Sequence, residues 1–156
     1  MSANPDSVQW VGHIKEIPMQ LQHSRTDIQV RFSDLDIIGH VSNSYYAQYF
    51  DLARVTFFRQ IAKQLGRENP AHVVASVKMD MLREICFDDT VVVDTWCSHV
   101  GTKSMTIEHL IYANGEKATT CQTVLVGFDR ETRTSKALPT DWEASDVSGV
   151  IPPRKD

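Results

Sequence analysis

The clearest hydrophobic pattern in the chain is a helical one that begins near residue 44. Its apolar positions recur at spacings of three or four, and they are Tyr46, Phe50, Ala53, Phe57, Ile61 and Leu65. This is the spacing of one face of an α-helix. The polar residues 42–44 can cap its start, because a short side-chain oxygen accepts a free backbone N–H, and Gly66 can end it in the left-handed conformation. The pattern predicts a helix of about 20 residues, which is about 30 Å long.

Strand-like segments lie on both sides of this helix. Residues 26–34 alternate Ile28, Val30 and Phe32 with polar residues, which is the period of a β-strand. Longer runs rich in Val, Ile, Thr and aromatic residues follow at 72–84, 89–101, 103–115 and 117–130. The Asn114-Gly115 pair predicts a tight hairpin, because both central positions of such a turn need positive φ. The order predicts an α+β fold with a strand, a buried helix and four strands in antiparallel succession.

The two ends of the chain carry weaker patterns. Residues 1–24 show little periodicity apart from a short strand-like run at 8–14, and residues 141–156 are polar and contain proline. We expect an N-terminal extension at 1–24, one folded domain at 25–140 and a partly disordered tail at 141–156. A length of 156 residues fits a single domain.

Charge and cysteine usage narrow the function classes. The formal net charge is −4 with no block of one sign, so neither nucleic acid nor a membrane surface is an expected partner. No apolar run approaches the roughly 20 residues of a membrane helix, and the N-terminus lacks the pattern of a signal peptide. Cys86, Cys97 and Cys121 are far apart, as expected of reduced thiols. We therefore expect a cytoplasmic protein.

The polar residues before the helix are the candidate chemistry. Asp34 and Asp36 end the first strand, where period two would place them on one face unless the turn intervenes; turn formation alone also explains them. The first N–H groups of the helix, at Asn43 and Ser44, lack helical partners and can polarise an acyl carbonyl. A carboxylate facing them would give an acyl-transfer site without serine or metal. His40 fits a base or a loop-fixing residue, and the scattered histidines argue against zinc.

Residues 30–54, VRFSDLDIIGHVSNSYYAQYFDLAR, closely resemble the characteristic motif of the 4-hydroxybenzoyl-CoA thioesterase family of hotdog-fold proteins. The family pattern is roughly V-R-x-x-D-x-D-x-x-G-H-V-N-N-x-x-Y-x-x-Y-F-E-x-A-R, and the similarity extends over residues 26–139. Two positions depart from it, since Ser42 stands where Asn is usual and Asp51 where Glu is usual. The resemblance implies a hotdog fold, in which a curved antiparallel five-stranded sheet wraps around a long central helix.

The same resemblance implies a function. It implies an acyl-CoA thioesterase, a hydrolase without a bound cofactor, in which CoA is part of the substrate. The second acid of the motif, Asp36, is the implied general base or nucleophile. The backbone N–H groups at the helix start, at Asn43 and Ser44, are the implied oxyanion site. An acyl-carrier-protein thioesterase and a non-catalytic acyl-CoA-binding hotdog protein remain the alternatives.

Further residues are implied by their positions in the family pattern. His40 and Tyr46 match positions that shape the loop and the helix, and they are candidates for substrate or CoA binding. Lys103 and Ser104 match a position near the CoA entrance, where a cation can meet phosphates. The family also implies a homodimer or a dimer of dimers, with active sites at the subunit interface. The sequence does not define the acyl group.

Overall fold

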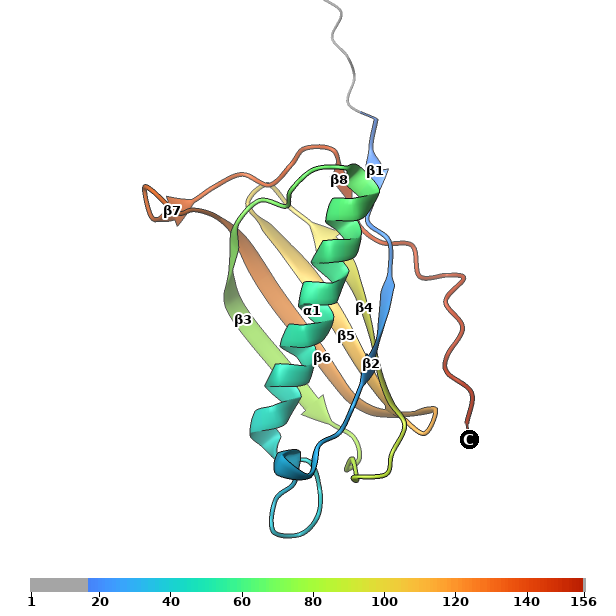
Figure 1. The fold of residues 1–156 in the computed structure, drawn as a ribbon. Coiled ribbons are helices and arrows are strands. Elements are labelled where there is room, and N and C mark those ends of the chain that lie inside the picture. The colour runs from blue at the N-terminus through green and yellow to red at the C-terminus, as the bar shows by residue number, and fades with distance from the viewer. Residues whose placement is uncertain (1–16, 156) are drawn as a thin grey trace, which may run out of the picture.

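The long helix forms as its pattern predicts. The computed structural model describes residues 17–155, so the strand-like run at 8–14 lies outside the described residues. Helix α1 spans Asn43–Leu65 and ends at Gly66, whose φ of 63° is the predicted left-handed cap (Figure 1). Its buried residues are Tyr46, Tyr49, Phe50, Ala53, Phe57, Phe58 and Ile61. The last residue of the predicted face, Leu65, is only partly buried.

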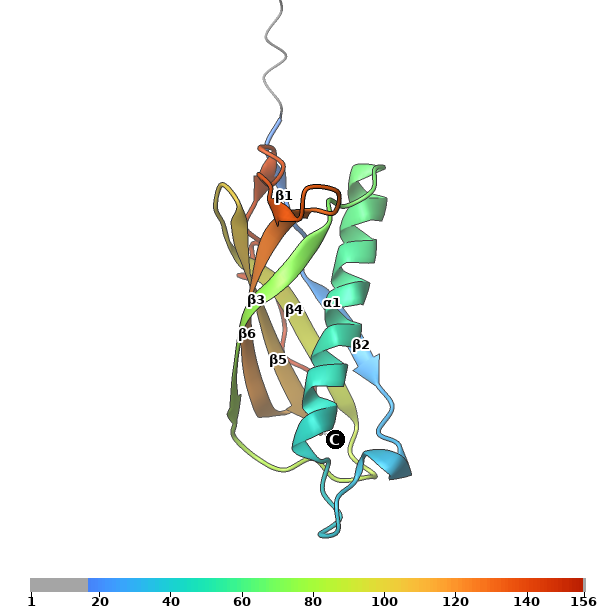
Figure 2. The ribbon, with the colours of Figure 1, turned by 90° about the vertical axis from the view of Figure 1, so that its left-hand side faces the viewer.

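A curved antiparallel sheet packs against this helix. In spatial order its strands are β2 (Ser24–Ile28), β4 (Val91–Val100), β5 (Ser104–Ala113), β6 (Glu116–Asp129) and β3 (His72–Met81). The short β7 (Thr134–Ser135) pairs antiparallel with the end of β6. A separate parallel pair joins β1 (Met19–Gln20) to β8 (Trp142–Glu143). Figure 2 shows α1 along the concave side of the sheet, so the predicted sheet around one helix is confirmed.

Two details of the predicted strands are wrong. The four strands after the helix do not pair in succession, because β3 pairs with β6 and lies at the edge far from β4. The linking segment 82–90 is longer than a hairpin loop. It lets the chain pass the N-terminal end of α1 on its way from β3 to β4. The first strand is also shorter than residues 26–34, because a 3₁₀ turn at Phe32–Asp34 interrupts it. Phe32 is therefore exposed instead of reaching the core.

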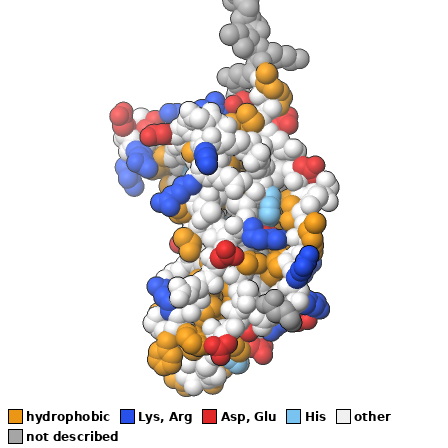
Figure 3. All heavy atoms as spheres, turned by 45° about the vertical axis from the view of Figure 1, so that its right-hand side comes forward, with side chains coloured by type: hydrophobic (Ala, Val, Ile, Leu, Met, Phe, Trp, Pro, Cys, Tyr) orange, Lys and Arg blue, Asp and Glu red, His pale blue; other side chains and the backbone are white. Residues whose placement is uncertain are grey.

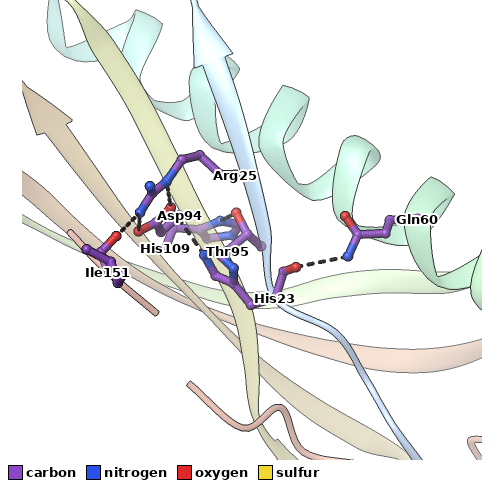
Figure 4. A network of polar contacts seen from close by, with 7 residues as sticks. All are labelled: His23, Arg25, Gln60, Asp94, Thr95, His109 and Ile151. Atoms are coloured by element: carbon purple, nitrogen blue, oxygen red, sulfur yellow. Dashed lines mark hydrogen bonds and ion pairs between the residues drawn. The ribbon is translucent and has the colours of Figure 1, made fainter. Parts of the chain in front are cut away.

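Packing fixes the position of α1 on the sheet. One cluster surrounds Phe50 near the start of the helix, and a second surrounds Phe57 near its middle. Beside Phe50 lies His109, which is buried on β5 and shares a 2.9 Å hydrogen bond with Thr95 (Figure 4). Burial lowers the pKa of His109 to about 3, so its imidazole is neutral in the core. A helix held along this length presents its first residues rigidly.

The C-terminal tail packs along the outside of the sheet. The Ser145 N–H donates to the carbonyl of Cys97 at 2.8 Å, at an edge of β4 beyond the end of β2. Farther along, Arg25 holds Asp94 with two hydrogen bonds of 2.6 and 2.7 Å and donates to the Ile151 carbonyl at 2.8 Å (Figure 4). The division at residues 24 and 140 and the disorder expected in the tail stay predictions.

Candidate active site

The loop before the helix is a compact structure closed by backbone hydrogen bonds. Leu35 and Val41 form a β-bridge across it, and the Ser42 N–H donates to the Asp34 carbonyl at 2.8 Å. At its bend Gly39 has a φ of 82°, a conformation that side-chain-bearing residues rarely adopt. These contacts bring the two acids of the motif next to the start of α1.

Asp34 is buried and fully engaged. Its Oδ2 accepts the Tyr49 hydroxyl at 2.6 Å and the Arg31 backbone N–H at 3.0 Å, and its Oδ1 accepts Arg31 Nε at 3.1 Å. Burial alone would raise the pKa of this carboxyl, but the hydrogen bonds from Tyr49 and Arg31 outweigh it and hold the pKa below its ordinary value. This carboxylate therefore ties the loop to the helix.

Asp36 is exposed and only half engaged. Its Oδ1 accepts the backbone N–H groups of Ile38 at 3.0 Å and His40 at 3.3 Å. Within residues 17–155 its Oδ2 has no hydrogen-bond partner. Of the two arrangements that the sequence allowed, the turn is the one that forms: the 3₁₀ turn that ends the strand buries Asp34, and Asp36 beyond it is exposed. Asp36 is the acid that can act on a ligand.

A cleft of about 360 Å³ opens between this loop, the start of α1 and the end of β3. It is lined by Asp36, Ile38, His40, Val41, Asn43, Tyr46, Met81, Leu82, Arg83 and Glu84. Four predicted site residues, at positions 36, 40, 43 and 46, thus meet in one cleft. Exposed apolar residues surround it, and Figure 3 shows hydrophobic side chains gathered at the lower end of the molecule.

The first turn of α1 reaches the cleft without a side-chain cap. Ser42 is the N-cap residue, yet among residues 17–155 no side chain caps the helix start. The Ser42 hydroxyl lies 3.4 Å from the Ser44 hydroxyl instead. One of the three candidate residues thus holds the N-cap position but makes no side-chain capping bond, and the N–H groups at Asn43 and Ser44 stay open to a ligand. Asn43 itself lines the cleft, whereas Ser44 does not.

His40 and Tyr46 form part of the wall of the cleft. His40 pairs with Cys86 in a β-bridge, and its carbonyl accepts the Asp36 N–H at 2.8 Å. Its backbone therefore fixes the loop, and the residue is part of the cleft lining. Tyr46 is buried, and burial raises the pKa of its phenol, so the hydroxyl stays protonated near neutral pH.

Lys103 and Ser104 do not reach the cleft within one chain. Ser104 pairs with Val126, which pairs with Val73 near the start of β3, whereas the cleft lies at the other end of this strand. Ten strand residues span about 33 Å. Lys103 Nζ donates instead to the Ser135 hydroxyl of β7, at 3.3 Å.

Sequence reasoning missed one wall of the cleft. Residues 81–84 follow the end of β3 and are more than forty positions from Asp36 in the chain. They arrive there only because β3 crosses to the edge beside β6. The available signal was the charged pair Arg83-Glu84 directly after an apolar strand, within the stretch that resembles the family.

The described part of the chain offers neither a metal cluster nor a membrane helix. Among residues 17–155 no group of three or more His, Cys, Asp or Glu side chains is placed to hold a metal ion. Nor does any helix there have the length and apolar character needed to cross a bilayer.

Comparison with known proteins identifies the family. A family model described as the thioesterase-like superfamily matches residues 30–146, which is most of the chain. The chain belongs to the thioesterase-like superfamily. The match includes the loop before the helix, α1, and strands β3, β4, β5 and β6, but not β2. The resemblance seen in the motif at residues 30–54 is confirmed.

Several individual proteins are similar to this superfamily member. The uncharacterized protein YsmA of Bacillus subtilis (strain 168) is 30% identical over 105 residues, covering 67% of this chain and 71% of that protein. A thioesterase of Thermus thermophilus, solved with coenzyme A and Zn, is 36% identical with a TM-score of 0.66, over 75% of this chain and 91% of that one. A 4-hydroxybenzoyl-CoA thioesterase mutant in complex with 4-hydroxybenzoyl-CoA has a TM-score of 0.63 at 17% identity, over 77% and 95%. This last likeness shows the hotdog fold alone.

Proposed function

We propose that this superfamily member is an acyl-CoA thioesterase that releases a free acid and CoA at the Asp36 cleft. One observation carries the proposal: an exposed carboxylate with a free oxygen and an uncapped helix N-terminus line the same cleft. The Thermus thermophilus relative, which was solved with coenzyme A, supports CoA as the carrier of the acyl group. A cytoplasmic location and the lack of nucleic-acid and membrane partners stay predictions.

The proposed chemistry divides between the two sides of the cleft. The N–H groups at Asn43 and Ser44 hold the thioester oxygen, where the helix dipole stabilises the negative charge that develops. Asp36 takes a proton from water, and the water oxygen bonds to the thioester carbon. The C–S bond then breaks, and the CoA thiolate leaves and takes up a proton. Alternatively, Asp36 attacks the carbon itself, the C–S bond breaks as the CoA thiolate leaves, and water hydrolyses the resulting anhydride to the free acid and the Asp36 carboxylate. Neither route uses a metal or a bound cofactor.

The proposed substrate contacts include two other wall residues. Tyr46 offers a neutral phenol beside the thioester, and His40 can contact the pantetheine arm while its backbone fixes the loop. Both proposals rest on their place in the cleft lining. The apolar neighbours Ile38, Val41 and Met81 suit an acyl group or the arm of CoA.

The free edge of the sheet supports a homodimer. β3 is an edge strand, and its exposed apolar side chains include Val73, Val74, Val77 and Met81. An uncovered apolar edge of this length is normally protected. We propose that two copies pair antiparallel along β3, with a dimer of dimers as a further possibility. Antiparallel pairing sets the start of one β3 beside the end of the other, so the partner subunit's Lys103 and the partner subunit's Ser104 approach the cleft.

Val77→Glu is expected to convert the dimer to a monomer. Val77 is half exposed near the middle of β3, so in an antiparallel pair centred on this position the two introduced carboxylates would face each other and repel. Light scattering during size exclusion measures the mass. Ser76→Glu adds the same charge on the neighbouring position and is expected to remain dimeric. A wild-type chain that is monomeric at micromolar concentration would refute the β3 dimer.

The function is tested with a substrate panel. Thiol release by the purified chain is followed with aliphatic and aromatic acyl-CoAs in the presence of EDTA, and with the same acyl groups on an acyl carrier protein. We expect kcat/KM on the best acyl-CoA to exceed that on the carrier protein by about tenfold or more, which is about 1.4 kcal/mol. Preference for the carrier protein would favour the first alternative. Tight acyl-CoA binding without turnover would establish the non-catalytic binding module.

A further inference from the structure

We propose that Arg83 binds an anionic oxygen of the thioester substrate in the Asp36 cleft, and that the C-terminal tail positions it through Glu116. This inference rests on the proposed function and adds a substrate-binding residue to it. It also gives the C-terminal tail a role in the Asp36 cleft.

Arg83 is fixed in the cleft wall by its backbone. The N–H groups of Leu82 and Arg83 both donate to the Ala118 carbonyl, at 2.9 and 3.1 Å, just past the end of β3. Arg83 is a lining residue of the cleft, and its side chain is one-third exposed. The side chain therefore extends from a backbone that is held in place, and it is neither buried in the core nor free in solvent.

The ion-pair cluster of Arg83, Glu116 and Lys155 carries an excess of positive charge. Arg83 Nη1 donates to one oxygen of Glu116 at 2.9 Å, and Lys155 Nζ donates to the other oxygen at 2.9 Å. Lys155 and then Arg83 lower the pKa of the Glu116 carboxyl, which therefore stays ionised at neutral pH. Two cations share one carboxylate, so the cluster keeps a single positive charge beside the cleft.

The rest of the cleft needs such a cation if the substrate is anionic. Its other ionisable wall residues include the acids Asp36 and Glu84, which repel a negative group. Among residues 17–155, Arg83 is the one lysine or arginine that lines the cleft. Its guanidinium carries further N–H donors beyond the one used by Glu116, in the planar arrangement that suits phosphate or carboxylate oxygens.

The tail reaches this cluster by defined contacts. The Ile151 carbonyl is held by Arg25, which is itself anchored on Asp94 (Figure 4). Four residues later the backbone at Lys155 packs against Gly115, where an added Cβ would collide with the tail. Gly115 lies in the hairpin directly before Glu116, so the tail places its lysine against the carboxylate that holds Arg83.

The chemistry recognised is an oxyanion, and two parts of an acyl-CoA can supply it. The phosphates of CoA are one source, and a carboxylate on the acyl group is the other. N-acetylcysteamine thioesters of the same acyl groups separate them, because these substrates keep the acyl group and thioester but have no phosphate.

The test is the KM of Arg83→Gln. We expect KM for acyl-CoA to rise about tenfold with kcat nearly unchanged, as for a contact equally strong in the ground and transition states. Arg83→Lys should restore part of the loss, since it keeps the charge. The control Arg67→Gln removes a cation that lies outside the cleft and pairs with Asp141, and it should leave KM unchanged.

The substrate arms assign the anion. A rise confined to CoA thioesters assigns it to a phosphate, and a rise on N-acetylcysteamine thioesters that carry an acyl carboxylate assigns it to the acyl group. An unchanged KM on every substrate that the wild type hydrolyses overturns the inference alone. If the wild type hydrolyses no thioester, the proposed function fails and the inference falls with it.

The role of the tail has its own variant. Lys155→Gln leaves Glu116 to neutralise Arg83 alone, and we expect KM to rise about twofold to threefold, within the range of exposed ion pairs. The midpoint of thermal unfolding should not change. A KM equal to that of the wild type would refute the role of the tail but not the role of Arg83.

Discussion

Asp36→Asn is expected to lower kcat for acyl-CoA hydrolysis by about 100-fold or more, the contribution of a well-placed general base. The amide keeps the oxygen that accepts the Ile38 and His40 N–H groups, so the loop should hold its shape. It cannot take a proton from water or attack the thioester. Because ground-state binding is unaffected, KM should stay within about twofold.

The measurement is steady-state thiol release on the best acyl-CoA, with the fold checked by circular dichroism. Asp27→Asn is the matched control, because this aspartate is exposed on β2 and does not line the cleft. It should retain the wild-type kcat. A rate for Asp36→Asn within a factor of a few of the wild type would reject Asp36 as the reacting group.

Asp34→Ala is expected to act mainly on stability, lowering the free energy of unfolding by about 3 kcal/mol. The change leaves the buried Tyr49 hydroxyl and the Arg31 N–H groups without their shared acceptor. Urea unfolding measures the effect. Tyr49→Phe removes only one of these donors, so it should be milder, about 1 kcal/mol.

The contacts of Asp34 also make the stability of the fold depend on pH. The folded chain holds the pKa of Asp34 below its ordinary value, so its contribution is complete above the unfolded pKa of about 3.9 and is lost as the pH falls below it. The wild type should therefore lose stability below about pH 4 more steeply than Asp34→Asn. If Asp34→Asn instead removed activity as fully as Asp36→Asn, the structural assignment of Asp34 would be wrong.

Local pattern was enough to predict the main elements. The apolar spacing from Tyr46 to Ile61 gave the helix, and the runs at 72–84 and 117–130 gave strands within a few residues of β3 and β6. Strand partners were another matter. Side-chain period describes one strand at a time, so nothing local indicated that β3 crosses to pair with β6.

The candidate site was predictable in part for the same reason. Residue chemistry placed an acid and a helix N-terminus near each other, but physics alone did not separate Asp34 from Asp36. The 3₁₀ turn separates them, because it buries one acid against Tyr49 and exposes the other. Arg83 was missed because it is close to Asp36 only in the folded chain.

The two departures from the family pattern have different consequences. The Ser42 side chain makes no capping hydrogen bond, since its hydroxyl lies beside that of Ser44, and this leaves the first N–H groups open. Asp51 forms a 2.6 Å ion pair with Arg54 on the surface of α1. Its shorter reach compared with glutamate is therefore accommodated within one helical turn.

A crystal structure of Asp36→Asn with an unhydrolysed acyl-CoA would show where the thioester binds. We expect the thioester carbonyl oxygen to lie about 2.7–3.1 Å from the backbone nitrogen of Asn43 or Ser44. The thioester carbon should face the substituted side chain at position 36. An acyl-CoA bound elsewhere, or one whose carbonyl points away from the start of α1, would show that the Asp36 cleft is not the catalytic site.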